Sequence, residues 1–188
     1  KNYKKVFYKK HKNVFKWLHD KIGSNYRMTE MQAAIGRIQL KSLDNQIKKR
    51  NFIAKLYLNG LKEFYEKYNI LNKPDFKCQS CPLKKNIKKC NRCRHAFYKL
   101  NMFLNKKKIQ NNLIRKLNKK SIISGVGSCP EIYRENIFKE LELQPKSRLQ
   151  NAKLLGETSL AFLINPFKSI QQIKNEILLI NKIIKQFI

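Results

Sequence analysis

GSNYRMTEMQ, residues 23–32, joins a short polar turn to the start of a helix. Thr29 and Gln32 have the spacing of a capping box, in which the threonine hydroxyl accepts from the backbone N–H of Gln32 and the glutamine side chain bonds back to residue 29. We therefore expect a helix to begin here. Its unpaired N–H groups would favour an anion such as a phosphate beside Asn25. The plainer interpretation is a well-capped helix that binds no ligand.

The residues after Thr29 continue this helix to about Tyr65. Apolar side chains recur every three or four positions, which predicts one long amphipathic helix with a single buried stripe. The stripe consists of Met31, Ile35, Ile38, Ile47, Ala54, Tyr57 and Leu61. Upstream of the helix, residues 1–22 are polar with scattered aromatic side chains, a composition typical of an irregular segment lying over a larger body.

Strands alternate with helices in the second half of the chain. Residues 96–104 place Ala96, Tyr98, Leu100, Met102 and Leu104 on one face, as a half-buried strand does. The elements expected after it are a helix over 106–118, a strand over 121–126, a short helix over 151–155, a strand over 159–164 and a last helix with Ile170, Ile173, Ile177, Ile180 and Ile184 on one face. This order predicts an α/β two-layer domain that a long helix precedes.

The composition is strongly basic. The 188 residues contain 42 Lys and Arg against 12 Asp and Glu, a formal net charge of +30. Such a charge often indicates a nucleic-acid partner, but the lysines are spread along the whole chain instead of forming one basic arm. We therefore expect no nucleic-acid partner. No apolar run approaches the roughly 18 residues that span a bilayer, so we expect a soluble, cytoplasmic protein.

Two CxxC pairs form a possible metal site. Cys78 and Cys81 make up the first pair, and Cys90 and Cys93 the second. Four thiolates from two such turns can close a tetrahedral site around Zn²⁺, which predicts a cysteine hairpin over residues 77–94 with structural zinc. Disulfides or free thiols are an alternative, and an iron–sulfur site is another.

Four blocks of sequence together resemble the DegT/StrS family of sugar aminotransferases. They are GSNYRMTEMQAAIGRIQLKSLD (residues 23–44), HAFYK (95–99), GSCPEIY (127–133) and LGETSL (155–160), in the order that one branch of the family shows. The resemblance implies the C-terminal portion of an enzyme of fold type I that uses pyridoxal 5′-phosphate (PLP). Residues 1–28 would belong to the large domain and dimer interface. Residues 29–188 would form the connecting helix and a small domain with a mainly antiparallel sheet packed against helices.

The resemblance also implies roles for single residues. Asn25 would bind the PLP phosphate in the other subunit of a homodimer, through an amide that adds no titrating group. Arg27, Glu131 and Tyr133 become candidates for substrate contact. The family's Schiff-base lysine lies upstream of the GSNYR block. We therefore expect no catalytic residue in this chain and no activity from it alone.

The reaction that the resemblance implies is transfer of an amino group. The donor would be an amino acid such as glutamate, and the acceptor a nucleotide-linked keto-sugar used for cell-surface polysaccharide or glycan synthesis. A PLP-dependent sugar dehydratase, in which the Schiff-base lysine is replaced, is the alternative within the family. A basic zinc-clip protein that binds nucleic acid is the alternative from another class.

Overall fold

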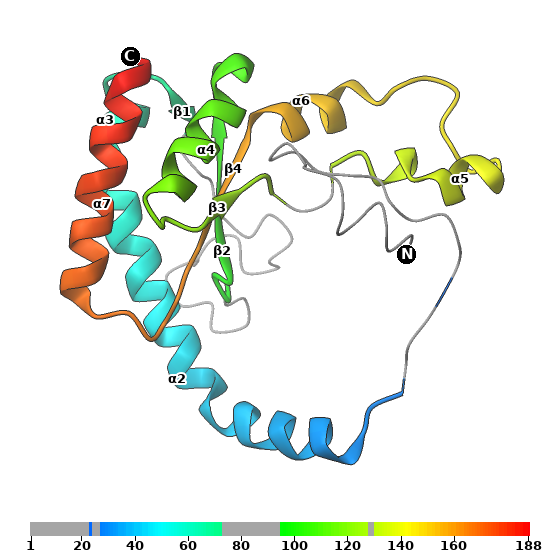
Figure 1. Ribbon diagram of the computed structural model, residues 1–188, viewed down its shortest axis with the longest axis horizontal. Helices are drawn as coiled ribbons and strands as arrows, with labels where there is room; N and C mark the ends of the chain where they lie inside the picture. The colour runs from blue at the N-terminus through cyan, green and yellow to red at the C-terminus, as the bar shows by residue number, and fades with distance from the viewer. Residues whose placement is uncertain (1–22, 24–26, 73–94, 128–129) are drawn as a thin grey trace, which may run out of the picture.

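The computed structural model describes residues 23, 27–72, 95–127 and 130–188. Asn25 lies outside the described residues, as do the four cysteines of the CxxC pairs and Cys129. The predicted phosphate contact and the cysteine hairpin over 77–94 therefore remain predictions. The described residues form an α/β unit (Figure 1).

Helix α2 (Glu30–Gly60) begins where the capping box predicts. The Thr29 hydroxyl accepts from the Gln32 backbone N–H at 3.3 Å, and the Gln32 side chain accepts from the Thr29 N–H at 3.0 Å. The expected end near Tyr65 was wrong, because Leu61 leaves the helical conformation at φ −103° and ψ 9°. A separate short helix, α3 (Lys62–Glu66), follows. The turn allows both Leu61 and Phe64 to be fully buried.

A four-stranded sheet lies at the centre of the molecule. The strands follow the order β1 (Leu71–Asn72), β2 (Lys99–Leu104), β4 (Ser159–Leu163) and β3 (Ser124–Gly125), and every neighbouring pair is antiparallel. This confirms the small antiparallel sheet. Strand β3 is shorter than the predicted 121–126, because Ser121 adopts a left-handed backbone (φ 59°) directly after a helix. Strand β1 was not predicted.

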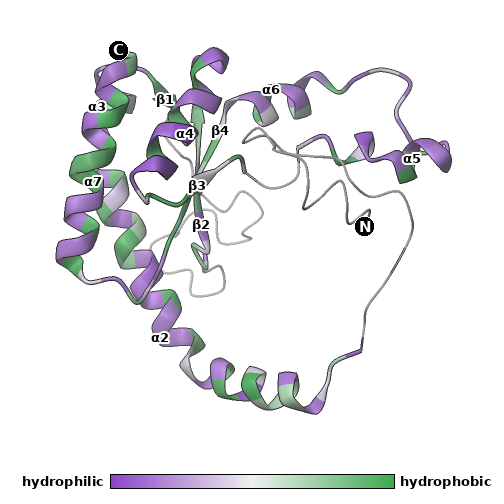
Figure 2. Cartoon of the chain, viewed as in Figure 1, coloured by the Kyte–Doolittle hydropathy of each residue, from purple (hydrophilic) through white to green (hydrophobic). Residues whose placement is uncertain are grey.

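Helices cover one face of this sheet. Helix α2 packs against α7 (Ile170–Ile184), and α7 packs against α4 (Gln110–Lys119), which follows a 3-10 turn, η2 (Lys107–Ile109). Figure 2 shows apolar and polar residues alternating along α2 and α7. Another 3-10 turn, η4 (Lys185–Phe187), follows α7. Within the described ranges, no helix has the length and apolar character to cross a bilayer.

The remaining elements lie on the side of the sheet away from α7. They are η3 (Ile132–Arg134), α5 (Asn136–Glu140) and α6 (Gln150–Thr158), and α6 contacts β2. The short helix predicted over 151–155 corresponds to α6, whereas α5 was not predicted. These elements form the right-hand part of Figure 1.

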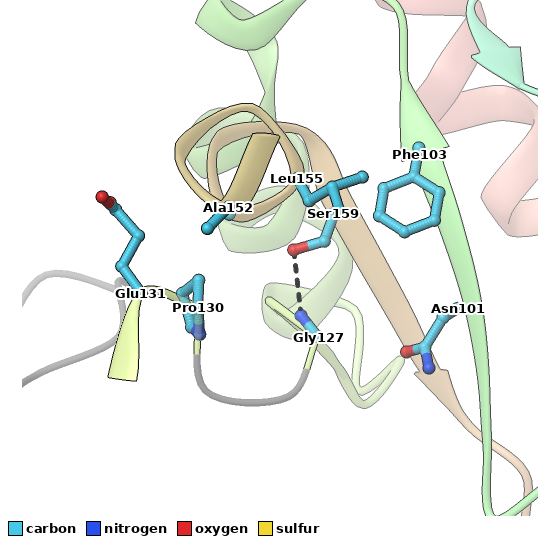
Figure 3. A pocket seen from close by; sticks show the side chains of 9 residues that line it. Asn101, Phe103, Gly127, Pro130, Glu131, Ala152, Leu155 and Ser159 are labelled. Carbon is cyan, nitrogen blue, oxygen red and sulfur yellow. Dashed lines mark hydrogen bonds between the residues drawn. The ribbon is translucent and has the colours of Figure 1, made fainter. Parts of the chain in front are cut away.

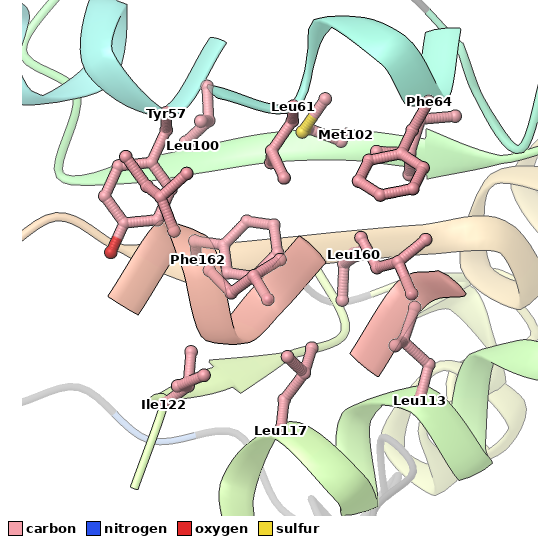
Figure 4. Close-up of a cluster of buried hydrophobic side chains, with 14 of the residues drawn as sticks. Tyr57, Leu61, Phe64, Leu100, Met102, Leu113, Leu117, Ile122, Leu160 and Phe162 are labelled. Atoms are coloured by element: carbon pink, nitrogen blue, oxygen red, sulfur yellow. The ribbon is translucent and has the colours of Figure 1, made fainter. Parts of the chain in front are cut away.

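The hydrophobic core fills the space between the sheet and its helices (Figure 4). Leu100 and Phe162 lie opposite each other in the β2–β4 register and are both buried. The Tyr57 ring packs 5.8 Å from that of Phe162. Burial, together with a hydrogen bond to Glu176, raises the pKa of Tyr57. Gly60 allows α2 to cross α7 closely, because a Cβ there would overlap the side chain of Ile177.

The alternation predicted for residues 96–104 holds only from Lys99 onward. Leu100, Met102 and Leu104 are buried as expected, but Tyr98 is 62% exposed and Phe97 is buried instead. Phe97 has a left-handed backbone (φ 43°), which shifts the phase of the side chains before the strand begins.

The single buried stripe predicted for α2 was also wrong in its first half. Ala54, Tyr57 and Leu61 are buried, but Met31, Ile35 and Ile38 are each more than half exposed. The reason is visible in Figure 1, where the N-terminal half of α2 extends beyond the end of α7. This half of α2 presents apolar side chains that the described residues do not cover.

Candidate functional site

A pocket of about 340 Å³ lies between α6 and the face of the sheet that the three core helices leave open (Figure 3). Its walls come from four parts of the chain: β2, the segment after β3, helix α6 and the start of β4. The lining residues are Asn101, Phe103, Gly127, Pro130, Glu131, Ala152, Leu155, Gly156 and Ser159.

The polar groups of this pocket are fixed by the backbone around them. The Ser159 hydroxyl accepts from the Gly127 backbone N–H at 3.1 Å and can still donate its own proton. Gln110 is buried and donates to the backbone oxygens of Gly156 and Ser159 at 2.9 and 2.7 Å, which holds α6 and β4 together at their junction. The Asn101 side chain projects from β2 beside the pocket.

The other side of the pocket is apolar. The Phe103 ring lies near Ser159, and Leu155 projects from α6 toward the same space (Figure 3). A space of this size with one aromatic wall and a few polar groups suits a single polar ring, which can place one face on the aromatic ring and its polar groups on Asn101 and Ser159.

Glu131 lies at the edge of the pocket and makes a dense set of polar contacts. Its carboxylate is 4% exposed and accepts from Arg148 Nε and Nη2 at 2.7 Å each. Tyr133 donates its hydroxyl proton to the same carboxylate at 2.7 Å, and Arg134 contributes a longer bond of 3.3 Å. These hydrogen bonds, led by those from Arg148, lower the pKa of Glu131 to about 2, despite the opposing effect of burial.

Tyr133 extends this set of contacts to α6. Its hydroxyl accepts from the Leu149 backbone N–H at 3.1 Å, and its backbone oxygen accepts from the Gln144 side chain at 2.8 Å. Burial and the bond to Glu131 raise the pKa of Tyr133. The contacts of Glu131, Tyr133 and Arg148 thus join the two ends of the loop that runs from η3 to the start of α6.

The low pKa of Glu131 predicts a loss of stability in acid. Its folded pKa of about 2 lies below the ordinary 4.5, so the ionised carboxylate stabilises the fold fully above pH 4.5 and loses this effect as the pH falls toward 2. We expect the free energy of unfolding to fall more steeply across this range in the wild-type chain than in Glu131→Gln. Urea unfolding at a series of pH values measures it. Parallel profiles for the two proteins would contradict the expectation.

The structure brings together two of the predicted substrate residues, Glu131 and Tyr133. Arg27 is exposed just before α2 begins. Sequence reasoning missed Arg148, which lies 17 residues from its partner Glu131, a separation that no motif marks. It also missed Ser159 and Asn101 as pocket residues, although Ser159 belongs to the LGETSL block.

Known proteins match both the sequence and the fold. The family described as DegT/DnrJ/EryC1/StrS aminotransferase matches residues 4–166. An aminotransferase from Psychrobacter cryohalolentis superimposes with a TM-score of 0.70 at 32% sequence identity, over 98% of this chain and 46% of that chain. None of the curated proteins gives a significant match.

Two more distant structures share the fold. Helicobacter pylori PseC, described as an aminotransferase in the biosynthesis of pseudoaminic acid, has a TM-score of 0.64 at 17% identity, over 94% of this chain and 43% of that one. The Escherichia coli GDP-4-keto-6-deoxy-D-mannose-3-dehydratase, which contains hydrated PLP, has a TM-score of 0.53 at 20% identity. The match covers 84% of this chain and 36% of that one. The chain therefore spans less than half the length of each of these three structures.

Proposed function

Because the chain belongs to the DegT/DnrJ/EryC1/StrS aminotransferase family, we propose that it acts as part of a longer PLP-dependent sugar aminotransferase. The supporting observation is the match to the Psychrobacter enzyme at 32% identity over almost the whole chain. The enzyme would transfer an amino group, from a donor such as glutamate, to a nucleotide-linked keto-sugar. The enzyme would lie in the cytoplasm. Its product would be used in polysaccharide or glycan biosynthesis.

The start of α2 suits a PLP phosphate. The capping box fixes the first turn of this helix, whose N-terminus favours an anion, and the side chain of Arg27 is exposed beside it. We propose that Asn25 donates to the phosphate across a dimer interface and that Arg27 adds positive potential there or toward the substrate. When bound, PLP supplies an electron sink for the amino transfer. The residues of this chain anchor it and supply no proton transfer in this proposal.

The pocket beside α6 is the proposed place for the sugar ring. Its size fits one ring, Asn101 and Ser159 can bond to ring hydroxyls, and Phe103 can pack against a ring face. Tyr133 and Glu131 border this place. Because both carboxylate oxygens of Glu131 already accept from Arg148, we assign Glu131 an indirect part in substrate binding.

The exposed half of α2 supports the proposed homodimer. Met31, Ile35 and Ile38 form an apolar surface that a monomer in water would not favour. We propose that residues 1–28 and this half of α2 meet the large domain and the second subunit, while the rest of 29–188 forms the small domain. Light scattering of the longer polypeptide tests this, and a monomer at micromolar concentration would contradict it.

A sugar dehydratase is the second candidate. The observation in its favour is the fold shared with the E. coli dehydratase. The lower identity of that match, 20% against 32% for the aminotransferase from Psychrobacter, favours the aminotransferase.

The test uses the longer polypeptide with PLP, an amino donor and a nucleotide-linked keto-sugar. We expect a change in the cofactor's absorbance on adding glutamate, and a nitrogen-containing sugar in the product by mass spectrometry. A product that has lost water and gained no nitrogen would instead establish the dehydratase. The 188-residue chain alone should retain no PLP after dialysis, and stoichiometric retention on one of its lysines would contradict the proposed position of the catalytic lysine.

We further propose that Cys78, Cys81, Cys90 and Cys93 bind one structural zinc ion. The support is their CxxC spacing. Among the described residues no cluster of His, Cys, Asp or Glu has the arrangement of a metal site, and these cysteines lie outside them. Protein purified under reducing conditions should contain about one zinc per chain, and less in acid, because cysteine thiols must lose their protons to bind zinc. Four freely titrating thiols without metal would exclude the site.

A further inference from the structure

Arg148 is the cation that holds the loop before α6 in place. Two of its nitrogens, Nε and Nη2, each lie 2.7 Å from an oxygen of Glu131. Such a planar fork restricts both distance and angle, as a lysine with a single nitrogen cannot. Arg134 also reaches Glu131, but through one bond of 3.3 Å. Arg148 is therefore the principal partner.

The loop that this ion pair closes has little core of its own. It consists of residues 132–147, including η3 and α5, and every residue from 139 to 151 is exposed. A segment with so few buried apolar contacts depends on its polar closures to keep one arrangement. Two of these closures are the Glu131–Arg148 pair and the bond from the Leu149 N–H to the Tyr133 hydroxyl. Both act at the point where α6 begins.

The same ion pair reaches the wall of the pocket through Pro130. Glu131 has a left-handed backbone (φ 51°), and its side chain points away from the pocket while Pro130 stands beside it (Figure 3). Pro130 packs closely on α6, since a Cβ at Gly156 would lie only 2.6 Å from the Pro130 Cβ. Holding Glu131 therefore also holds Pro130 against α6.

We propose that Arg148 is a positioning residue for sugar binding. Its two hydrogen bonds to Glu131 set the distance between Pro130 and α6, and this distance is the width of the pocket that takes the sugar ring. This rests on the proposed function, and specifically on the pocket as the sugar site. Arg148 itself does not touch the substrate. It acts through Glu131, which directly follows Pro130 in the chain.

The first test measures hydrogen exchange in the 188-residue chain by NMR. In Arg148→Met we expect the Leu149 amide to exchange at least about tenfold faster, while amides of β2 and β4 keep their rates. Arg148→Lys should recover part of the protection through one remaining bond. Lys168→Met is the matched control, because Lys168 donates to both oxygens of another largely buried carboxylate, that of Glu176, at 2.7 and 2.8 Å. It should leave Leu149 unchanged.

Two results would overturn the local role of Arg148. One is unchanged exchange at Leu149 in Arg148→Met. The other is an equal acceleration in β2 and β4, which would mean general destabilisation. This measurement needs neither cofactor nor sugar, so its outcome is independent of whether the longer enzyme is an aminotransferase.

The second test separates the two half-reactions of the longer enzyme. Arg148→Met should raise the KM for the nucleotide-linked sugar at least about fivefold and change the half-reaction with the amino donor by less than about twofold. The KM of Arg148→Lys for the sugar should lie between those of the wild type and Arg148→Met. Equal losses in both half-reactions, or an unchanged sugar KM, would overturn the positioning role. Absence of both half-reactions in the wild-type enzyme would instead contradict the proposed function.

Discussion

Replacing Phe162 by alanine is expected to cost about 3–5 kcal/mol in the free energy of unfolding. Phe162 lies in β4, is 1% exposed and packs on the ring of Tyr57. Its removal leaves a cavity between the sheet and the core helices that neighbouring side chains can fill only in part. Because small domains have a stability of only about 5–15 kcal/mol, the loss should be large enough to unfold much of the chain at moderate temperature.

Phe167 is the matched control for this prediction. It is the same residue type, five positions further on, but 80% exposed. Phe167→Ala should change the unfolding free energy by no more than about 0.5 kcal/mol, as surface substitutions usually do. Urea unfolding followed by circular dichroism compares the two. Similar losses in both variants would show that the packing of β4 against α2 and α7 is not what stabilises the chain.

Local signals predicted the helices best. The pair Thr29 and Gln32 fixed the start of α2 to the residue, because a capping box involves only four consecutive positions. The isoleucines at 173, 177, 180 and 184 are buried in α7 as their spacing predicted, although Ile170 is 53% exposed. That residue is the first of the helix.

Features that depend on long-range contacts could not be predicted in this way. The left-handed backbone of Phe97 reverses which side chains are buried before β2, and nothing in the alternating pattern marks it. The pair of Glu131 and Arg148 depends on how a loop closes in space. The resemblance drew attention to Glu131 as a substrate contact, whereas its geometry shows a carboxylate already bonded within the chain.

The apolar stripe of α2 illustrates a different limit. The spacing of the apolar residues predicted which of them share one face of the helix. It does not predict which part of the protein, or which partner, covers that face. Tyr57 and Leu61 are covered by this chain's own core, whereas Met31 and Ile35 are exposed in it. The proposed dimer and large domain would account for this difference, because one helix would then be buried in two different environments along its length.

In the longer enzyme, Asn25→Ala is expected to weaken PLP binding by about 1.5–3 kcal/mol, the usual cost of losing a hydrogen bond to a charged group. This corresponds to a rise in the dissociation constant of roughly 10- to 150-fold. Equilibrium dialysis of the enzyme with PLP measures it. The matched control is Ser24→Ala, in the same turn but without the amide that the proposal requires; it should leave PLP affinity nearly unchanged.

Subunit mixing tests whether Asn25 acts across the dimer. Asn25→Ala protein is mixed with a variant that lacks the proposed cofactor-binding lysine. In the resulting heterodimer, one active site has its lysine from the Asn25→Ala chain and its phosphate contact from the intact Asn25 of the other chain. That site is complete, so up to about half of the wild-type activity per dimer should return. If subunit exchange is demonstrated and no activity returns, or if Asn25→Ala binds PLP as tightly as wild type, Asn25 is only a turn residue before a capped helix.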